Sequence, residues 1–291
     1  MTAIMNTKTT ATTNLSSTQF STGQVTSADG TTIGYRHVGR GPGLVIMHGG
    51  ARASHHYLHL AEALSDSYTV YIPDRRGRGL SGSKGEDYSI RREIEDLRAL
   101  LQKNDARILF GHSAGGFVAL EAALDLPIEK LALYEPAVSI GGSVNFDWID
   151  PVEKAFARND PAAAFVSFIK GLHMNWMTKL PFWFLYPLAR LMLHEAEGRE
   201  MVALLPTVIW EAKEIQRLDS TYERYRSLSA ATLLLSGSKS PTYLRNILPV
   251  LAQTIPYVQQ LELPGLNHNA PDQEAPERIA SQVKQFLLDR G

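Results

Sequence analysis

The feature of this sequence that most constrains its fold is a series of short, almost wholly apolar runs that alternate with helix-like segments. LVIM at 44–47, ILF at 108–110 and TLLL at 232–235 are such runs, and a helix-like segment follows each of them. Strands that are apolar on both sides are typical of a parallel sheet with two covered faces. Because strands and helices alternate, we predict an α/β fold with a mostly parallel central sheet and helices on both faces.

Local signals place the other elements. Two strand-like segments, 24–27 and 31–38, flank Ala28-Asp29-Gly30, in which Asp-Gly is typical of a hairpin turn. Apolar periodicity predicts helices over 54–64, 89–103, 113–124, 243–255 and 275–288, and further strands over 68–72, 131–134 and 258–263. The pattern continues to the end of the chain, apart from one long interruption.

That interruption, 137–228, has a helical pattern and contains all four tryptophans of the chain, Trp148, Trp176, Trp183 and Trp210. We expect an insertion of this size between two strands to form a helical cap over one sheet edge. The tryptophans either build the core of the cap or form an apolar roof over a site below, so Trp183 and Trp210 are candidate substrate contacts. The predicted domains are a disordered leader at 1–22, a core at 23–136 and 229–291, and the cap at 137–228.

Charge and composition exclude several classes of partner. The net charge is -1 with no long run of one sign, which disfavours binding to nucleic acid. The apolar stretch 180–193 is interrupted by Pro181, Pro187 and Arg190, and is too short to cross a bilayer core of about 30 Å. The leader has no continuous apolar region of the kind found in secretory signals. We therefore expect no transmembrane segment and a small-molecule substrate as the partner, with a homodimer as an open alternative to a monomer.

The chain has no cysteine, which excludes disulfides, thiolate metal sites and cysteine nucleophiles. The same absence is typical of proteins in a reducing compartment, so we expect a cytoplasmic location.

Gly111-His112-Ser113-Ala114-Gly115 follows a predicted strand and opens a predicted helix. A strand, G-x-S-x-G and a helix in this order form a nucleophile elbow, a sharp turn that exposes the serine hydroxyl. The glycines permit close approach of strand and helix, and the helix N-terminus favours negative charge. The alternative is a glycine-rich turn in which the serine only caps the helix. Ser113 is the candidate nucleophile.

With this motif the sequence resembles the α/β-hydrolase superfamily over nearly the whole chain after the leader. His48-Gly49-Gly50, after the third predicted strand, is similar to the oxyanion loop of that family. Asp74 to Ser81, after the fourth, is similar to its D-x-R-G-x-G-x-S turn, in which we expect Asp74 and Arg76 to hold the loop. Gly265-Leu266-Asn267-His268 follows the last strand, where the family places its histidine.

The resemblance implies roles for individual residues. His268 would be the base of Ser113, and the backbone N–H groups of Gly50 and Ala114 would bind the oxyanion. His48, Gly49 and His112 lie in the oxyanion loop and the elbow, so they are candidates to line the substrate pocket.

The acid departs from the common pattern of the family, which places an aspartate in a G-x-x-D turn after the cap. Here that turn is Gly237-Ser238-Lys239-Ser240, and no carboxylate occurs between Glu223 and Glu262. Glu135 ends an apolar strand before Pro136, and some relatives, haloalkane dehalogenases among them, place their acid after this earlier strand. We therefore predict Glu135 as the acid; the alternative is an ion-paired glutamate that anchors the cap. Asp272 and Glu274 lie near the histidine in sequence, and we expect them to cap the last helix.

The resemblance implies acyl transfer through an acyl-enzyme on Ser113, without a metal or a cofactor. We therefore expect hydrolysis of a carboxylic ester or lactone of a small, mainly apolar substrate. Hydrolysis of a carbon–carbon bond and cofactor-free perhydrolysis are alternatives on the same triad. A ligand-binding protein on a hydrolase scaffold is an alternative from another class. Ser240 in place of an aspartate favours that class, and the elbow, loop and histidine together disfavour it.

Overall fold

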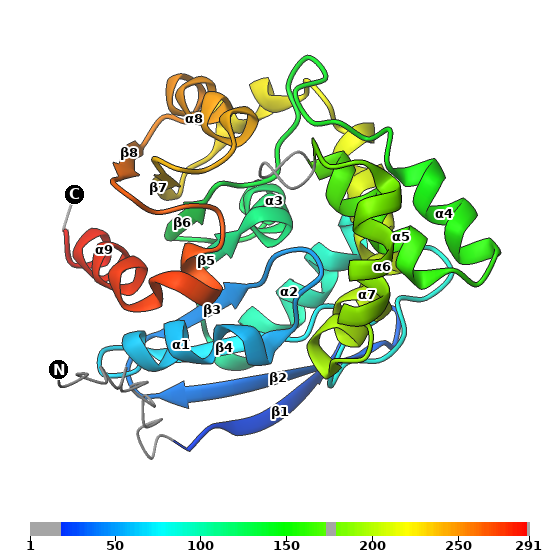
Figure 1. The fold of residues 1–291 in the computed structure, drawn as a ribbon. Helices are drawn as coiled ribbons and strands as arrows, with labels where there is room; N and C mark the ends of the chain where they lie inside the picture. The colour runs from blue at the N-terminus through cyan, green and yellow to red at the C-terminus, as the bar shows by residue number, and fades with distance from the viewer. Residues whose placement is uncertain (1–18, 173–178, 290–291) are drawn as a thin grey trace, which may run out of the picture.

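The computed structural model describes residues 19–172 and 179–289, which form one eight-stranded sheet surrounded by helices (Figure 1). The strand order is β1-β2-β4-β3-β5-β6-β7-β8. The strands are β1 (Ser21–Thr26), β2 (Thr32–Gly39), β3 (Gly43–Met47), β4 (Thr69–Pro73), β5 (Ile108–His112), β6 (Lys130–Tyr134), β7 (Ala231–Gly237) and β8 (Val258–Leu263). β2 pairs antiparallel with β1 and β4, and all other pairs are parallel. The predicted fold class is confirmed.

Alternate residues of the central strands face two separate hydrophobic cores, as the period of two along a strand requires. In β3, Val45 and Met47 face the core covered by α2 (Ile90–Asn104), α3 (Ser113–Ala122) and α8 (Thr242–Thr254). Leu44 and Ile46 face the core covered by α1 (Leu58–Leu64) and α9 (Pro276–Leu288). Both faces are covered, which explains why the central strands are almost wholly apolar in sequence.

Along the chain, the described residues between β6 and β7 form α4 (Ile149–Ala157), α5 (Pro161–Leu172), α6 (Phe182–Met192) and α7 (Ala196–Arg217), on the right in Figure 1. They share a third hydrophobic core, and the short helix η3 (Tyr222–Ser227) leads back to the sheet. Tyr225 and Leu228 already pack into the core beneath the sheet. The helical insertion is confirmed, and its division at residues 137 and 228 stays a prediction.

The first strand begins earlier than the sequence indicates. Ser21 and Thr22 fall in the predicted leader, yet they pair with His37 and Arg36 of β2. Pairing with a partner strand overrides a weak local pattern, because the backbone groups gain hydrogen bonds whatever the side chains are. Positions 1–18 of the predicted leader lie outside the described residues.

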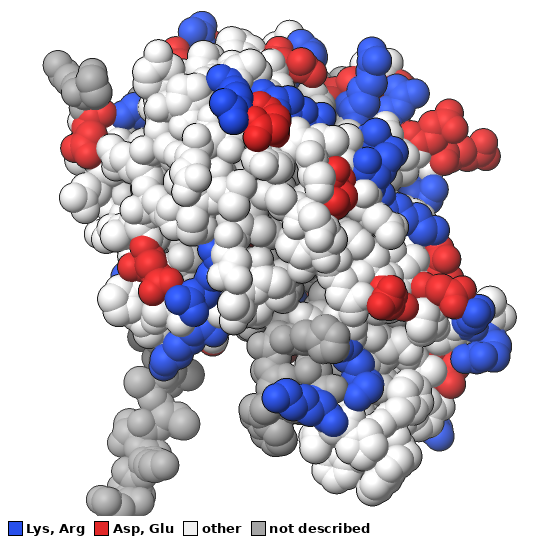
Figure 2. Space-filling model, turned by 90° about the horizontal axis from the view of Figure 1, so that it is seen from above, with Lys and Arg blue, Asp and Glu red and all other residues white. Residues whose placement is uncertain are grey.

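The surface carries both signs of charge. Figure 2, a view from above, shows Lys and Arg beside Asp and Glu on the visible face, including the side where the helical insertion lies. Lys213 of α7 and Glu153 of α4, for example, form an ion pair with an N···O distance of 2.6 Å. Among the described residues, no helix is both long enough and apolar enough to cross a membrane.

Candidate active site

Ser113 lies at a sharp turn between β5 and α3. Its backbone has a φ of +53°, a left-handed conformation that costs free energy for any residue with a side chain. Glycines make the turn sterically allowed. A Cβ at Gly111 would lie 2.6 Å from the Cα of Gly116, and one at Gly115 would lie 2.3 Å from the carbonyl oxygen of His48. The turn therefore has the geometry of the predicted elbow, with Ser113 at the carboxyl edge of the parallel strands.

Glu135 and His268 are in direct contact. Glu135 follows β6 with a φ of +46°, and its side chain is fully buried. One carboxylate oxygen, Oε2, lies 2.6 Å from Nδ1 of His268, and the other accepts a hydrogen bond of 2.8 Å from the N–H of Gly237 at the end of β7. With Nδ1–H donating to the carboxylate, Nε2 of His268 remains free to accept a proton. The carboxylate thus orients the imidazole.

The two other carboxylates near His268 have different partners. Asp272 binds Arg52, with 2.6 Å between Nε and Oδ2, and Glu274 accepts a hydrogen bond of 2.5 Å from Asn267. The expectation that they cap the last helix is wrong. Their carboxylates bind Arg52 and Asn267 instead, and the N-cap residue of α9 is Ala275.

His112, a predicted pocket residue, is buried and linked on both sides to the protein. Its Nδ1 lies 2.5 Å from the hydroxyl of Tyr57, and its Nε2 lies 2.9 Å from the carbonyl oxygen of His268. The Tyr57 hydroxyl also accepts a hydrogen bond of 3.0 Å from the N–H of Gly49. Burial, together with the nearby His268 and Arg52, holds the pKa of His112 well below its usual value, so the ring is neutral. This chain of bonds joins the Gly49 loop to the backbone of His268.

His48 is also buried, and protein groups occupy both of its ring nitrogens. Nε2 accepts a hydrogen bond of 3.1 Å from the N–H of Arg75, and Nδ1 lies 3.0 Å from the carbonyl oxygen of Gly49. Burial and the charges of Arg78 and Arg75 hold the pKa of His48 well below its usual value. Neither His48 nor His112 has a ring nitrogen left for a substrate. Both rings are buried, which corrects the expectation that they line a substrate pocket.

Gly49 lies against the nucleophile candidate. A Cβ at Gly49 would lie 3.5 Å from the Cβ of Ser113, so the loop after β3 and the elbow approach each other closely. Ala114 is the second residue of α3, and the first N–H groups of a helix have no acceptor within it. The structure thus brings the Gly49-Gly50 loop and the N-terminus of α3 to the same place as Ser113.

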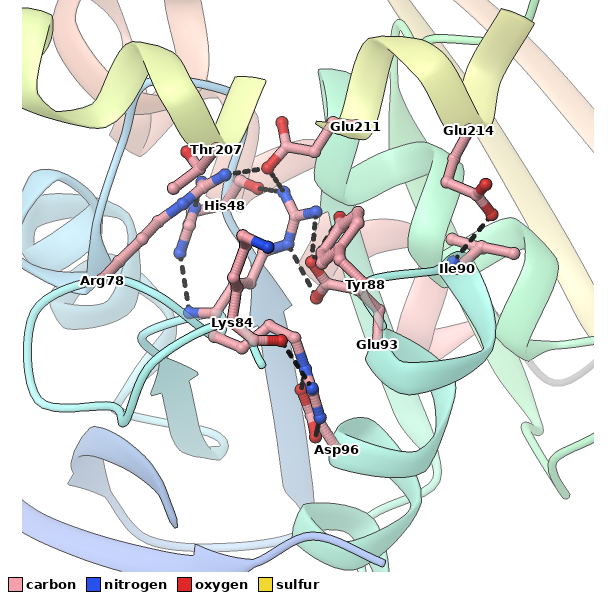
Figure 3. A network of polar contacts seen from close by, with 12 residues as sticks. His48, Arg78, Lys84, Tyr88, Ile90, Glu93, Asp96, Thr207, Glu211 and Glu214 are labelled. Carbon is pink, nitrogen blue, oxygen red and sulfur yellow. Dashed lines mark hydrogen bonds and ion pairs between the residues drawn. The ribbon is translucent and has the colours of Figure 1, made fainter. Parts of the chain in front are cut away.

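Four charged side chains form a buried group beside this loop (Figure 3). Arg75 and Arg78 come from the turn after β4, Glu93 from α2, and Glu211 from α7 of the insertion. Arg75 makes two hydrogen bonds to Glu93, of 2.8 and 3.1 Å, and its Nη1 lies 3.2 Å from Oε1 of Glu211. Arg78 pairs with the same oxygen of Glu211. Two positive and two negative side chains balance one another in a region without water contact.

Through this group the insertion holds the loop. Arg78 donates hydrogen bonds from Nη1 to the carbonyl oxygens of Gly49, at 3.3 Å, and Arg52, at 3.2 Å. A Cβ at Gly50 would lie 3.3 Å from Oε2 of Glu211. Among the described residues, no aligned hydrogen bond reaches either Glu211 oxygen, so Glu211 acts here by charge and contact.

Asp74 and Arg76 hold the turn at 74–81, as the sequence analysis predicts. Asp74 accepts hydrogen bonds from the N–H groups of Ser54, at 2.6 Å, and Leu80, at 2.9 Å. Arg76 makes two hydrogen bonds to Asp96, of 2.8 and 2.7 Å. This turn therefore supports the neighbouring loop from below.

The tryptophans of the insertion that the structure describes have different surroundings. Trp148 is buried in the core of the helical insertion, in edge-to-face contact with Phe168. Trp183 is 75% exposed on α6, and Trp210 on α7 packs under the ammonium of Lys84 at 4.1 Å. Trp176 lies outside the described residues. Trp183 and Trp210 as substrate contacts stay predictions.

Tyr57, Arg75, Arg78 and Glu211 are site residues that the sequence reasoning missed. Two signals in the sequence indicate the three charged residues among them, and none indicates Tyr57. The turn after β4 has three arginines within four residues, 75–78. Such a density of positive charge in one turn indicates carboxylate partners nearby. Glu211 shares the apolar face of its helix with Val208, Ala212 and Ile215, and a carboxylate at such spacing indicates a buried partner.

A model of the family described as "Alpha/beta hydrolase family" matches residues 44–282. The chain is 35% identical over 94 residues to the magnesium-chelatase 30 kDa subunit of Rhodobacter capsulatus, covering 31% of this chain and 33% of that protein. It is 33% identical over 115 residues to the cis-3-alkyl-4-alkyloxetan-2-one decarboxylase of Shewanella oneidensis, covering 37% of this chain and 36% of that protein. The chain thus spans about a third of the length of these curated relatives. A solved alpha/beta hydrolase of Sphaerobacter thermophilus is similar with a TM-score of 0.77 and 29% identity, covering 91% of this chain and 100% of that one.

Proposed function

Because the chain belongs to the alpha/beta hydrolase family, we propose that it is an enzyme, a serine hydrolase that cleaves a carboxylic ester or lactone. Ser113 is the nucleophile, His268 the base and Glu135 the acid of its triad. The contact of 2.6 Å between His268 Nδ1 and Glu135 Oε2 carries the proposal, because it orients an imidazole at the sheet edge where the Ser113 turn lies.

The reaction would follow the steps of acyl transfer. As Ser113 Oγ attacks the carbonyl carbon, its proton moves to Nε2 of His268, and the carbonyl oxygen becomes an oxyanion. The N–H groups of Gly50 and Ala114 donate to that oxyanion. The C–O bond to the alcohol then breaks, and His268 returns the proton to the leaving oxygen. Water attacks the acyl-enzyme in the same way, which releases the acid and restores Ser113.

The support of the loop strengthens the assignment of Gly50. A donor works only if it is fixed where the negative charge develops, since movement during the reaction would cost free energy. Arg78 holds the preceding carbonyl, that of Gly49, and Tyr57 holds the Gly49 N–H. Glu211 and Val208 of α7 cover Gly50 from the other side. These contacts favour a preorganised oxyanion site.

Two observations favour a small, mainly apolar ester or lactone. The oxetan-2-one named for the Shewanella oneidensis relative is a cyclic ester with alkyl substituents, although the two chains share only part of their length. The helical insertion over the loop has a largely apolar core that includes Ala51 of the loop itself. A cytoplasmic location and a homodimer stay predictions; light scattering after gel filtration would test the second.

A labelling experiment tests the proposed nucleophile. A fluorophosphonate probe should label Ser113 and inactivate the enzyme, and Ser113→Ala should remove both labelling and turnover of p-nitrophenyl acetate and butyrate. Ser83→Ala, at an exposed position, is the control and should behave as the wild type. Turnover retained in Ser113→Ala, or labelling of another serine, would contradict the proposal. Absence of both labelling and turnover in the wild type would favour the ligand-binding alternative.

A panel of substrates tests the bond that is cleaved. Esters and lactones of rising alkyl chain length should be hydrolysed with kcat/KM rising about threefold to fourfold per methylene until the site is full. A vinylogous β-diketone cleaved faster than every ester would instead favour carbon–carbon hydrolysis on the same triad.

A further inference from the structure

A cluster of imidazole and carboxylate groups lies outside the proposed triad, where the first turn after the Gly49-Gly50 loop meets the helical insertion. The short helix η1 (Ser54–Tyr57) carries His55 and His56, whose ring centroids lie 4.0 Å apart. Glu200 of α7 approaches them, with 3.1 Å between its Oε1 and Nε2 of His55. One ligand atom from each of the three side chains lies within 4.8 Å of the others. The proposed reaction uses none of them.

The donor set is one that a transition metal prefers. Two imidazoles and one carboxylate bind Zn²⁺ in many proteins, at about 2.0–2.2 Å, and a water completes the tetrahedron. In such a tetrahedron neighbouring ligand atoms lie about 3.3 Å apart. The His55–Glu200 distance already fits this value. The side chains of His55 and Glu200 are 40% and 39% exposed, which leaves a path for the ion and room for small rotations.

The surroundings of His56 suit a metal ligand. A metal binds a histidine through a nitrogen of the neutral ring. The Nδ1 of His56 accepts a hydrogen bond of 3.1 Å from the N–H of Ala53 and lies 3.3 Å from the carbonyl oxygen of the same residue. Binding of an ion at Nε2 therefore requires the other tautomer, in which Nδ1–H donates to the Ala53 carbonyl. A ligating histidine usually makes such a bond with its second nitrogen, which leaves Nε2 free for the ion. The charge of Arg52 is paired with Asp272 at 2.6 Å, which limits its repulsion of a cation.

We propose that His55, His56 and Glu200 form a binding site for a divalent transition-metal ion, and that Zn²⁺ is the ion its donors suit best. The ion would join η1 of the core to α7 of the insertion. Glu211 makes a second link between the same helix and the same loop region from inside the protein. A bound ion would therefore hold α7 at two places along its length, once by buried charge and once by coordination at the surface.

Zinc titration of the tag-free, chelator-treated full chain tests the site. Isothermal titration should show one Zn²⁺ per chain, and His56→Ala and Glu200→Gln should each raise the Kd by at least about tenfold. His59→Ala is the matched control, an exposed histidine on α1 a few residues away, and should leave the Kd unchanged. Co²⁺ in the wild type should give the visible absorption of a tetrahedral ion, and His56→Ala should abolish it.

A thermal measurement tests the link between core and insertion. Zn²⁺ should raise the Tm of the wild type and of Ser113→Ala, but not that of His56→Ala or Glu200→Gln, because only an ion that binds the folded state at this site stabilises it. The Ser113→Ala result keeps this test separate from the proposed hydrolysis. The proposal would be overturned if the wild type bound no Zn²⁺ at 1 mM, a Kd that corresponds to about 4 kcal/mol of binding free energy. It would also be overturned if His56→Ala and Glu200→Gln bound Zn²⁺ as tightly as the wild type.

Discussion

The two sides of the proposed active site are built differently. Ser113, Glu135 and His268 each follow a strand of the sheet, after β5, β6 and β8, so the core positions the proposed triad. The Gly49-Gly50 loop also follows a strand, β3, but its outer side is held by Glu211 of the helical insertion. Sheet geometry fixes the first side, and a balance of buried charges holds the second. Damage to the first should therefore change catalysis alone, and damage to the second should change stability and catalysis together.

The largest expected effect is on the triad side. Glu135→Gln keeps the shape and the bond to Gly237 but removes the charge that favours protonated His268, so kcat should fall about 10⁴-fold. The free energy of unfolding should change little, since the amide can still accept from Gly237. Steady-state kinetics and urea denaturation measure the two quantities.

Asp272→Asn and Glu274→Gln are the controls, because those carboxylates bind Arg52 and Asn267. Ser240→Asp in the Glu135→Gln background places a carboxylate at the usual position of the family and should restore part of the rate. If Glu135→Gln keeps most of its activity, the triad has another acid or none.

The next effect is on the loop side. Among the described residues, Glu211→Gln leaves Glu93 as the one carboxylate in a buried ion pair with either Arg75 or Arg78, and such loss of one partner costs about 3–5 kcal/mol of unfolding free energy. Urea denaturation measures it, and kcat should fall as well because Gly50 loses its support. Glu214→Gln, on the same helix but paired with the exposed Arg217, should cost about 1 kcal/mol or less.

A double variant sharpens this test. Glu211→Gln combined with Arg78→Met restores the balance of buried charge, so it should be more stable than the sum of the two single changes predicts. Strict additivity of the two changes in unfolding free energy would show that the buried charges act independently and do not hold the loop as a balanced group.

A smaller effect is expected at Tyr57, which connects the two sides. Tyr57→Phe leaves the Gly49 N–H and Nδ1 of His112 without their partner in a buried place, at a cost of about 1–3 kcal/mol. Tyr68→Phe is the control, since its hydroxyl makes no hydrogen bond among the described residues. A loss of stability in Tyr57→Phe without any change in kcat would show that the loop keeps its position without this link.

The smallest expected effect is a pH dependence of stability. The pKa values of His48 and His112 are lowered in the folded protein, so below the usual histidine value of about 6.5 the unfolded chain binds protons that the folded chain does not. Stability is therefore complete above that pH and is lost as the pH falls, by up to about 1.4 kcal/mol per pH unit for each ring.

Denaturation curves between pH 7.5 and 5.5 (a span chosen around the histidine value of about 6.5) measure this slope. His112→Gln should reduce the slope of unfolding free energy against pH by about the contribution of one histidine ring. His59→Gln, at an exposed position, should not alter the slope. An unchanged slope in His112→Gln would mean that this ring titrates alike in both states.

The contrast between the two sides also explains what the sequence could predict. Ser113 and Glu135 stand after short apolar runs and His268 follows the last strand, and the carboxyl ends of parallel strands meet at one edge. These patterns, together with the family resemblance, were sufficient to propose the three residues. Glu211 and Arg78 form an ion pair although 133 residues separate them in the sequence. No local pattern predicts which buried charges pair with one another. For the same reason His48 and His112 were predicted as pocket residues: the sequence places them beside the site but does not show the depth at which they lie.

Because Glu135 precedes the insertion in the sequence, the residues of the proposed site are synthesised in a particular order. Synthesis proceeds from the N-terminus, and segments fold as they leave the ribosome. The proposed oxyanion loop, the nucleophile and the acid, residues 48–135, all emerge before the first helix of the insertion. His268 follows Glu135 by 133 residues, so the base is supplied only after the insertion has been synthesised. If the proposed roles hold, Ser113 of a nascent chain has no base until the last strand and helix join the sheet.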